Sequence, residues 1–147
     1  MTPPAQPFRW PIRVYYEDTD AAGIVYYANF LRFFERARTE WLRALGVAQR
    51  RLTAESGLQF VVAQADVSFL KPARLDDALV ATVAITERAR SFLIFAQELL
   101  RADELLARAR VKVACVDRSS LAPRRLPDWL IQQMSQQLTP CLPAATE

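Results

Sequence analysis

The stretch NFLRFFERARTEWLRALG, residues 29–46, decides the fold, because it is the longest and most regular element that the sequence predicts. Its apolar residues recur at the i, i+3, i+4 spacing of an amphipathic helix and form one wide face. These residues are Phe30, Phe33, Phe34, Ala37, Trp41, Ala44 and Leu45. We predict that Asn29 is the N-cap of this helix and that Gly46 ends it.

Stretches of alternating apolar and polar residues flank the helix on both sides. Before it, residues 9–17 alternate as a half-buried strand does. After it comes a short helical link at 48–55, and then four more strand-like runs at 60–70, 78–86, 91–100 and 104–116. The connections at 74–77 and 101–103 are short, so neighbouring strands are predicted to be antiparallel. A last short helix is predicted after Leu126, with Pro127 near its first turn.

The alternation also predicts which side chains share the inner face of each strand. They are Trp10, Ile12, Val14 and Tyr16; then Val61, Ala63, Ala65, Val67 and Phe69; then Leu79, Ala81, Val83 and Ile85; and finally Ala107, Ala109, Val111, Val113 and Cys115. The run at 91–100 begins Phe-Leu-Ile-Phe and is predicted to be buried on both faces at first.

One helix with a nearly continuous apolar face needs a sheet to cover it, and an antiparallel sheet can curl around it. The sequence therefore predicts an α+β hot-dog fold, with a long central helix wrapped by a curved antiparallel sheet of about five strands. We expect a single domain over residues 8–138, with disordered tails at 1–7 and 139–147.

The composition excludes several kinds of chemistry. The chain has no histidine, which rules out Ser-His and Cys-His nucleophile pairs and histidine-ligated metals. Its three glycines cannot build a phosphate-cradling loop. Two cysteines, Cys115 and Cys141, are too few for a disulfide framework or a structural zinc site. We expect neither a metal nor an organic cofactor.

The charge and the ends of the chain set the expected location and partners. The net charge of +3 would favour an anionic small molecule, but it is not the basic stripe of a nucleic-acid-binding protein. No apolar run approaches the roughly 20 residues of a membrane span, and residues 1–7 do not resemble a signal peptide. We therefore expect a cytoplasmic protein that binds no nucleic acid.

The segment before the helix holds the residues with the most chemical potential. It carries three carboxylates within four residues (Glu17, Asp18 and Asp20), and then Gly23. A helix N-terminus has free N–H groups and about half a positive charge, so a carboxylate there lies beside donors for an oxyanion. Two simpler interpretations are a carboxylate that only stabilises the helix dipole and a calcium loop. The calcium loop is disfavoured, because Ala22 and Asn29 stand where ligands belong.

The same segment resembles a known family signature. The pattern R-V-x4-T-D-x2-G-I-V-x-Y-x2-F, residues 13–30, resembles that of the 4-hydroxybenzoyl-CoA thioesterase family. The stretches FFERARTE (33–40) and LKPARLDD (70–77) look more particularly like the tol–pal-associated acyl-CoA thioesterase branch. The resemblance covers about residues 8–135.

This resemblance implies a hot-dog fold and a set of site residues. Asp20 would attack the thioester carbonyl or activate the water that does so, and the backbone N–H of Tyr27 would polarise the carbonyl. Gly23 would allow a sharp turn near the acyl group, with Val25 and Asn29 also at the substrate. The branch often has histidine where this chain has Tyr27, so its substrate preference does not carry over.

The phosphates of CoA need cationic or amide donors, for which Arg88, Arg90 and Ser91 are the first candidates. They stand at the turn before the 91–100 strand, where related enzymes meet the nucleotide. Lys71 and Arg74 are further options, and each of these cations can equally be a plain surface charge. Three acidic residues are weaker catalytic candidates: Glu17 faces solvent, Asp18 makes loop hydrogen bonds, and Glu35 is a surface charge of the helix.

The leading hypothesis is therefore hydrolysis of an acyl-CoA, with acyl carrier protein left open as a second thioester donor. A hot-dog dehydratase is disfavoured by the lack of histidine. A non-catalytic or carrier-protein-specific binding module at the cell envelope remains an alternative. We expect a homo-oligomer, a dimer or a tetramer, because the fold leaves strand edges open. The resemblance places the site at the subunit boundary. The sequence does not identify the acyl group.

Overall fold

A computed structural model describes residues 7–135 of the chain. Its elements are, in order, β1 (Phe8–Arg13), a short 3-10 turn η1 (Tyr16–Asp18), α1 (Ala28–Ala44), α2 (Gln49–Ser56), β2 (Leu58–Phe69), β3 (Ala78–Arg88), β4 (Phe92–Arg101), β5 (Glu104–Asp117) and α3 (Asp128–Ser135). Apart from Pro7, the predicted tails at 1–7 and 139–147 lie outside the described residues, and so does Cys141. None of the described helices has the length and apolar character needed to cross a bilayer.

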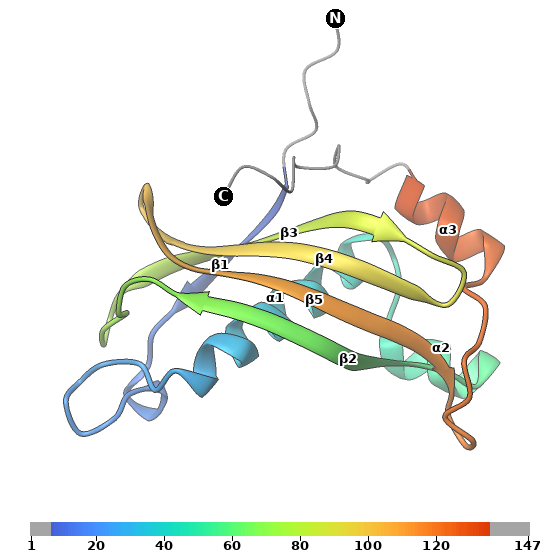
Figure 1. Cartoon of the computed structure of the whole chain (residues 1–147), viewed down its shortest axis with the longest axis horizontal. Coiled ribbons are helices and arrows are strands. Elements are labelled where there is room, and N and C mark those ends of the chain that lie inside the picture. Colours follow the sequence, from blue (N-terminus) through green and yellow to red (C-terminus); the bar gives the residue numbers. More distant parts are fainter. Residues whose placement is uncertain (1–6, 136–147) are drawn as a thin grey trace, which may run out of the picture.

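The five strands form one antiparallel sheet in the order β1-β3-β4-β5-β2. The sheet curves across α1, which runs along one of its faces, while α2 and α3 lie together at one end (Figure 1). This confirms the predicted α+β hot-dog fold. The predicted strand limits at β3, β4 and β5 differ from the observed ones by at most two residues.

The core lies between α1 and the inner face of the sheet. Phe33, Phe34 and Ala37 of α1 are completely buried. The ring of Trp41 meets that of Phe95 edge-on, with 5.5 Å between their centroids. The predicted inner residues of β3 and β5 are all buried, which confirms the alternation there. Burial raises the pKa of the Cys115 thiol, as expected of a small buried hydrophobe.

The end of α1 and the buried position of Leu45 are predicted correctly, whereas Ala44 is not buried. Gly46 follows the helix with φ +86°, the left-handed conformation of a C′ glycine. Ala44 is exposed, whereas Leu42 is buried. Leu42 lines a cavity together with Gln49 of α2.

The first strand is shorter than predicted, because a local turn replaces the ladder. Strand β1 ends at Arg13, Val14 is still buried, and Tyr16 is 82% exposed rather than inward-facing. The Asp18 carboxylate accepts the N–H of Tyr15 at 2.8 Å, and the N–H of Asp18 donates to the Tyr15 carbonyl. Short polar side chains compete with strand pairing in this way.

Strand β2 also departs from the predicted alternation. It pairs only with β5 and forms an edge of the sheet, and most of its residues are exposed, including the predicted inward Ala63 and Ala65. A bulge between Val62 and Gln64 shifts the register. Before it, Phe60 and Val62 face inward in place of the predicted Val61, because they pair with the buried Cys115 and Val113. After it, Ala65, Val67 and Phe69 pair with buried residues of β5, so their predicted face is correct even though Ala65 is exposed. Phe60 and Val67 still pack against the core.

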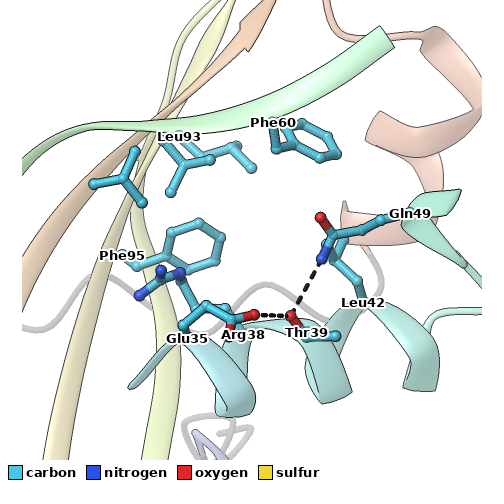
Figure 2. A pocket seen from close by; sticks show the side chains of 10 residues that line it. Glu35, Arg38, Thr39, Leu42, Gln49, Phe60, Leu93 and Phe95 are labelled. Atoms are coloured by element: carbon cyan, nitrogen blue, oxygen red, sulfur yellow. Dashed lines mark hydrogen bonds between the residues drawn. The ribbon is translucent and has the colours of Figure 1, made fainter. Parts of the chain in front are cut away.

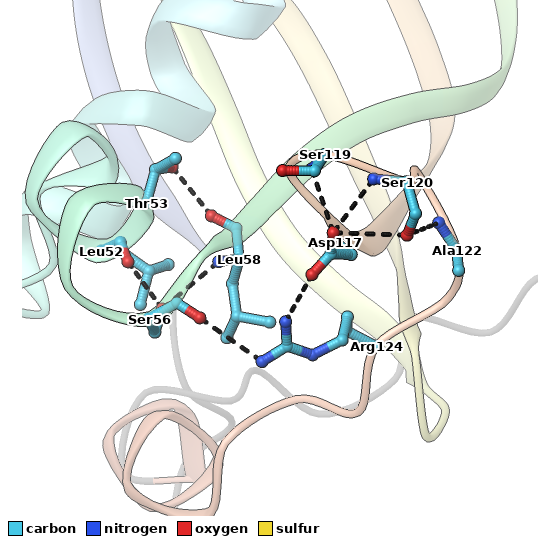
Figure 3. A network of polar contacts seen from close by, with 9 residues as sticks. All are labelled: Leu52, Thr53, Ser56, Leu58, Asp117, Ser119, Ser120, Ala122 and Arg124. Atoms are coloured by element: carbon cyan, nitrogen blue, oxygen red, sulfur yellow. Dashed lines mark hydrogen bonds and ion pairs between the residues drawn. The ribbon is translucent and has the colours of Figure 1, made fainter.

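A polar network closes the end of the sheet that carries α2 and α3 (Figure 3). Asp117, the last residue of β5, accepts the backbone N–H groups of Ser119 and Ser120, both at 3.0 Å. Its other oxygen accepts from Arg124 at 2.9 Å, and Arg124 also reaches the Ser56 carbonyl of α2. The network fixes the connection that leads to α3.

Asp117 should make the fold sensitive to acid. The N–H groups of Ser120 and Ser119, helped by Arg124, hold the pKa of its carboxyl below its ordinary value. A depressed folded-state pKa gives stability that is present above the unfolded pKa and is lost as the pH falls through the folded pKa. We expect Asp117→Asn to lower the melting temperature at neutral pH and to lose less on acidification than wild type. Equal acid slopes in the two melting curves would contradict this role.

Candidate active site

The segment between β1 and α1 is held against the start of α1 by Asp18. This buried residue accepts two hydrogen bonds at its backbone carbonyl, from the Tyr26 N–H at 3.1 Å and from the Asn29 side chain at 2.9 Å. The predicted loop role of Asp18 is confirmed. The predicted N-cap role of Asn29 is wrong: α1 begins at Ala28 with Tyr27 at the cap position, and the Asn29 amide is used to fix Asp18 instead.

Asp20 lies at the tip of this segment in a tight turn. Its Oδ1 accepts the N–H of Ala22 at 2.9 Å and that of Ile24 at 3.3 Å, and its own N–H donates to the Ile24 carbonyl at 2.8 Å. Gly23 has φ +76°, which confirms the predicted sharp turn. Within residues 7–135, Oδ2 of Asp20 receives no hydrogen bond, and the residue is exposed. One carboxylate oxygen is therefore fixed and the other is open.

The stretch that follows β2 forms backbone hydrogen bonds with the same turn. The N–H of Val25 donates to the Ala73 carbonyl at 2.8 Å, and Ile24 forms a bridge with Arg74. The LKPARLDD stretch, which the sequence marks as part of the family resemblance, thus holds the Asp20 turn in place. Lys71 of this stretch, a further candidate for binding phosphate, is paired with Glu104 at 2.8 Å.

The start of α1 offers backbone donors next to the turn. In the described part of the chain, the N–H groups of Tyr27 and Ala28 donate to no protein acceptor. The Tyr27 ring is 60% exposed and meets Phe69 of β2 edge-on at 5.7 Å. A free N–H at a helix N-terminus attracts developing negative charge. An open carboxylate and free donors thus lie on one short segment.

Two of the three predicted phosphate-binding residues lie around a separate hollow of about 400 Å³. Arg88 and Arg90 line it together with Arg125, which sequence reasoning missed. Arg125 comes close because the N–H of Leu126 donates to the Arg90 carbonyl at 2.9 Å. Ser91 is not among the lining residues, and its carbonyl accepts from the Cys115 N–H. Arg125 reaches the hollow only through this contact between distant parts of the chain, so no local sequence motif could have predicted it.

The two groups of predicted site residues lie at opposite ends of one chain. Strand β3 begins opposite Arg13, near the Asp20 turn, and ends at Arg88. At about 3.3 Å per residue, this strand separates them by roughly 30 Å. Figure 1 shows the Asp20 turn at one end of the sheet and the β3–β4 turn beside α3 at the other. The structure does not bring Arg88, Arg90 or Ser91 to Asp20 within one chain.

The described residues contain no group of three or more histidine, cysteine or acidic side chains placed to hold a metal ion. The chemistry open to the Asp20 segment is that of a carboxylate and backbone amides: nucleophilic attack or proton abstraction, with an oxyanion bound at the helix start.

Comparisons with known proteins identify the family of the chain. Residues 14–134 match the thioesterase-like superfamily. The acyl-CoA thioester hydrolase YbgC of Escherichia coli is 46% identical over 130 residues, which cover 88% of this chain and 96% of that protein. The acyl-CoA thioesterase YbgC of Haemophilus influenzae is 46% identical over 120 residues, or 82% and 88% of the two chains. A solved 1,4-dihydroxy-2-naphthoyl-CoA thioesterase of Synechocystis superposes with a TM-score of 0.82 at 25% identity, covering 88% of this chain and 96% of its own. The chain belongs to the thioesterase-like superfamily.

Proposed function

We propose that the protein hydrolyses an acyl-CoA thioester to a free acid and CoA, with Asp20 as nucleophile or general base. One observation carries the proposal: the open carboxylate oxygen of Asp20 stands on the segment that ends in the free N–H groups at the start of α1. The names of the two YbgC relatives support this substrate class. The CoA thioester in turn supports a cytoplasmic location.

The expected mechanism uses both parts of the segment. The thioester oxygen accepts a hydrogen bond from the Tyr27 N–H, so that negative charge on it is stabilised in the transition state. The open oxygen of Asp20 then attacks the carbonyl carbon, CoA leaves as its thiolate, and water cleaves the acyl-aspartyl anhydride. In the alternative route, Asp20 takes a proton from the attacking water. The bonds to Ala22 and Ile24 hold the carboxylate in place for either route.

Release of CoA from a panel of acyl-CoA thioesters tests the proposal directly. The panel should run from short to long aliphatic acyl groups and include an aromatic one, with matched acyl carrier protein thioesters alongside. Turnover of a CoA thioester supports the proposed function. Turnover of carrier-protein thioesters alone would move the function to that donor, and binding of CoA with no turnover at all would favour the binding module.

A second copy of the chain is proposed to complete the site. The arginine hollow is roughly 30 Å from Asp20 of the same chain. We infer that one thioester is not bound by the hollow and by Asp20 of the same chain. The exposed edge β2 carries the half-exposed side chains of Val62 and Phe69, and the exposed ring of Tyr27, at the cap of α1, contacts Phe69. An edge strand beside apolar side chains is a surface that self-association would cover. A two-fold pair would place unlike ends of two chains side by side.

Mixing two defective variants tests this two-chain site. We expect the double variant Arg90→Ala, Arg125→Ala to raise KM about tenfold with little change in kcat, because it removes charge-assisted phosphate contacts. Heterodimers of this variant with Asp20→Asn should regain activity, since one of their two sites combines Asp20 of one chain with the arginines of the other. Arg32→Ala, which changes an exposed arginine of α1 away from the hollow, is the matched control. A mixture no more active than its separate parts would overturn the two-chain arrangement.

A further inference from the structure

A cavity of about 210 Å³ lies between α1 and the edge strand β2, apart from the Asp20 segment (Figure 2). Aromatic and aliphatic side chains form one wall, and polar side chains of α1 and α2 form the other. Its lining residues on the apolar side include Phe60, Leu93 and Phe95, and on the polar side Glu35, Arg38 and Thr39. We name it the Arg38 cavity, after the cation at its wall.

The guanidinium of Arg38 is fixed by Gln97, which stands on the otherwise apolar inner face of β4. Gln97 is only 1% exposed, and its Oε1 accepts a hydrogen bond from Arg38 Nη1 at 2.9 Å. Its Nε2 donates to the carbonyls of Phe34 and Thr82, so the amide has one orientation and its oxygen must face Arg38. The buried Gln97 amide therefore fixes the position of the Arg38 guanidinium.

Most of the donors on this guanidinium are unused. Arginine has five N–H donors. Within the part of the chain that the structure describes, Gln97 is the only side chain that accepts from Arg38. The carboxylate of Glu35 accepts instead from the Thr39 hydroxyl, as Figure 2 shows. Burial lowers the pKa of Arg38 and the charge of Glu35 opposes that shift, but an arginine stays cationic at any physiological pH.

The cavity lies between α1, which begins at the proposed oxyanion donors, and β2, which ends beside them. Phe69, at the end of β2, contacts Tyr27 and Phe30 at the start of α1. Phe60 and Val62, earlier in β2, line the cavity together with Arg38. The strand thus runs antiparallel to the helix. Arg38 follows Ala28 by ten residues, which is about 15 Å along a helix with a rise of 1.5 Å per residue.

We propose that the Arg38 cavity receives the far end of the acyl group, and that Arg38 selects acyl groups carrying a carboxylate at that end. The inference rests on the proposed thioester hydrolysis and adds a substrate class to it, the monothioesters of dicarboxylic acids. The apolar wall takes the methylene chain, and the guanidinium, with its free donors, takes the carboxylate in a fork-to-fork pair. A plain alkyl end would displace water from those donors without replacing its hydrogen bonds, which is unfavourable.

Matched thioester pairs test the selection. The pairs are hexanoyl- and adipoyl-CoA, octanoyl- and suberoyl-CoA, and decanoyl- and sebacoyl-CoA, which differ only in the terminal carboxylate. For at least one pair, wild type should show a kcat/KM at least about tenfold higher for the carboxylated member, since charged hydrogen bonds give about 10- to 100-fold. Arg38→Met should abolish or reverse that preference, because it removes the donors that hold the terminal carboxylate.

Two further variants separate selection from folding. Arg36→Met removes an exposed arginine of the same helix that lies over the Phe33 ring, and it should leave the preference unchanged. Arg38→Lys keeps a cation beside Gln97 but loses the fork, so it should give an intermediate preference. Melting curves of all variants show whether a lost preference accompanies a lost fold. If Arg38→Met proves to be unfolded, the preference of Arg38→Lys decides the test instead.

Binding of the free acids separates this inference from the proposed function. Suberate should perturb the NMR signals of the Gln97 amide and the Phe60 and Phe95 rings in wild type and not in Arg38→Met, and octanoate should do so less. Competitive inhibition by suberate would identify the acyl pocket, whereas non-competitive inhibition would make it a separate carboxylate site and overturn the acyl assignment. If wild type cleaves no thioester, the proposed function fails, and suberate binding alone then supports or overturns the ligand class. Equal kcat/KM values within every pair would overturn the inference while thioester hydrolysis stands.

Discussion

Asp20→Asn is expected to lower kcat/KM for the best acyl-CoA substrate by about 10³-fold, the size typical of losing a nucleophile or positioned general base. The amide retains an oxygen that can still accept from Ala22 and Ile24, so the turn should keep its shape. What is lost is the negative charge on the open oxygen. The melting temperature should therefore change little while the turnover falls.

Two neighbouring carboxylates are the controls for this variant. Glu17→Gln changes an exposed residue of the 3-10 turn and should leave both turnover and stability near wild type. Asp18→Asn changes a buried acceptor that holds the Tyr15 N–H, so it should lower stability more than Asp20→Asn does. Wild-type turnover in Asp20→Asn would show that the working group lies elsewhere, and Glu35 and Asp18 would be tested next.

Periodicity predicted the parts of the fold in which burial decides the conformation. The inner faces of β3 and β5 and the main face of α1 are correct because each must cover the same core. The edge strand β2 was predicted correctly only after its bulge, because the shift between Val62 and Gln64 puts Phe60 and Val62 on the inner face in place of Val61. The first strand was overextended for a different reason. Asp18 forms a turn of its own, which competes with the ladder.

The site could be predicted only where it is local in sequence. The Asp20 turn, Gly23 and the helix start lie within one segment, so a motif and the known physics of helix ends were enough to find them. Arg125 and the Arg38–Gln97 pair could not be found in this way. They are brought together by the packing of separate elements, and an inward glutamine on a strand gives no sign of its partner on a distant helix.

The second large effect is expected from Tyr27→Pro, which deletes one backbone N–H. Tyr27 has φ −55°, which proline adopts without strain, and its N–H donates to no acceptor among the described residues. The helix should therefore start as before. Because a single oxyanion donor is worth about 10²–10³ in rate, kcat should fall by about that factor.

The matched variants for this position keep the N–H and change only the side chain. Tyr27→Phe removes the hydroxyl, and Tyr27→Ala also removes the ring that meets Phe69 at 5.7 Å. If the donor is the backbone, Tyr27→Phe should retain nearly full kcat, and Tyr27→Ala should affect mainly KM through the lost aromatic contact. A large loss in Tyr27→Phe would instead assign the role to the hydroxyl. Full activity in Tyr27→Pro would move the donor to the N–H of Ala28, the other free amide at this helix start. That outcome would leave the carboxylate chemistry of Asp20 unchanged, because only the position of the oxyanion would differ.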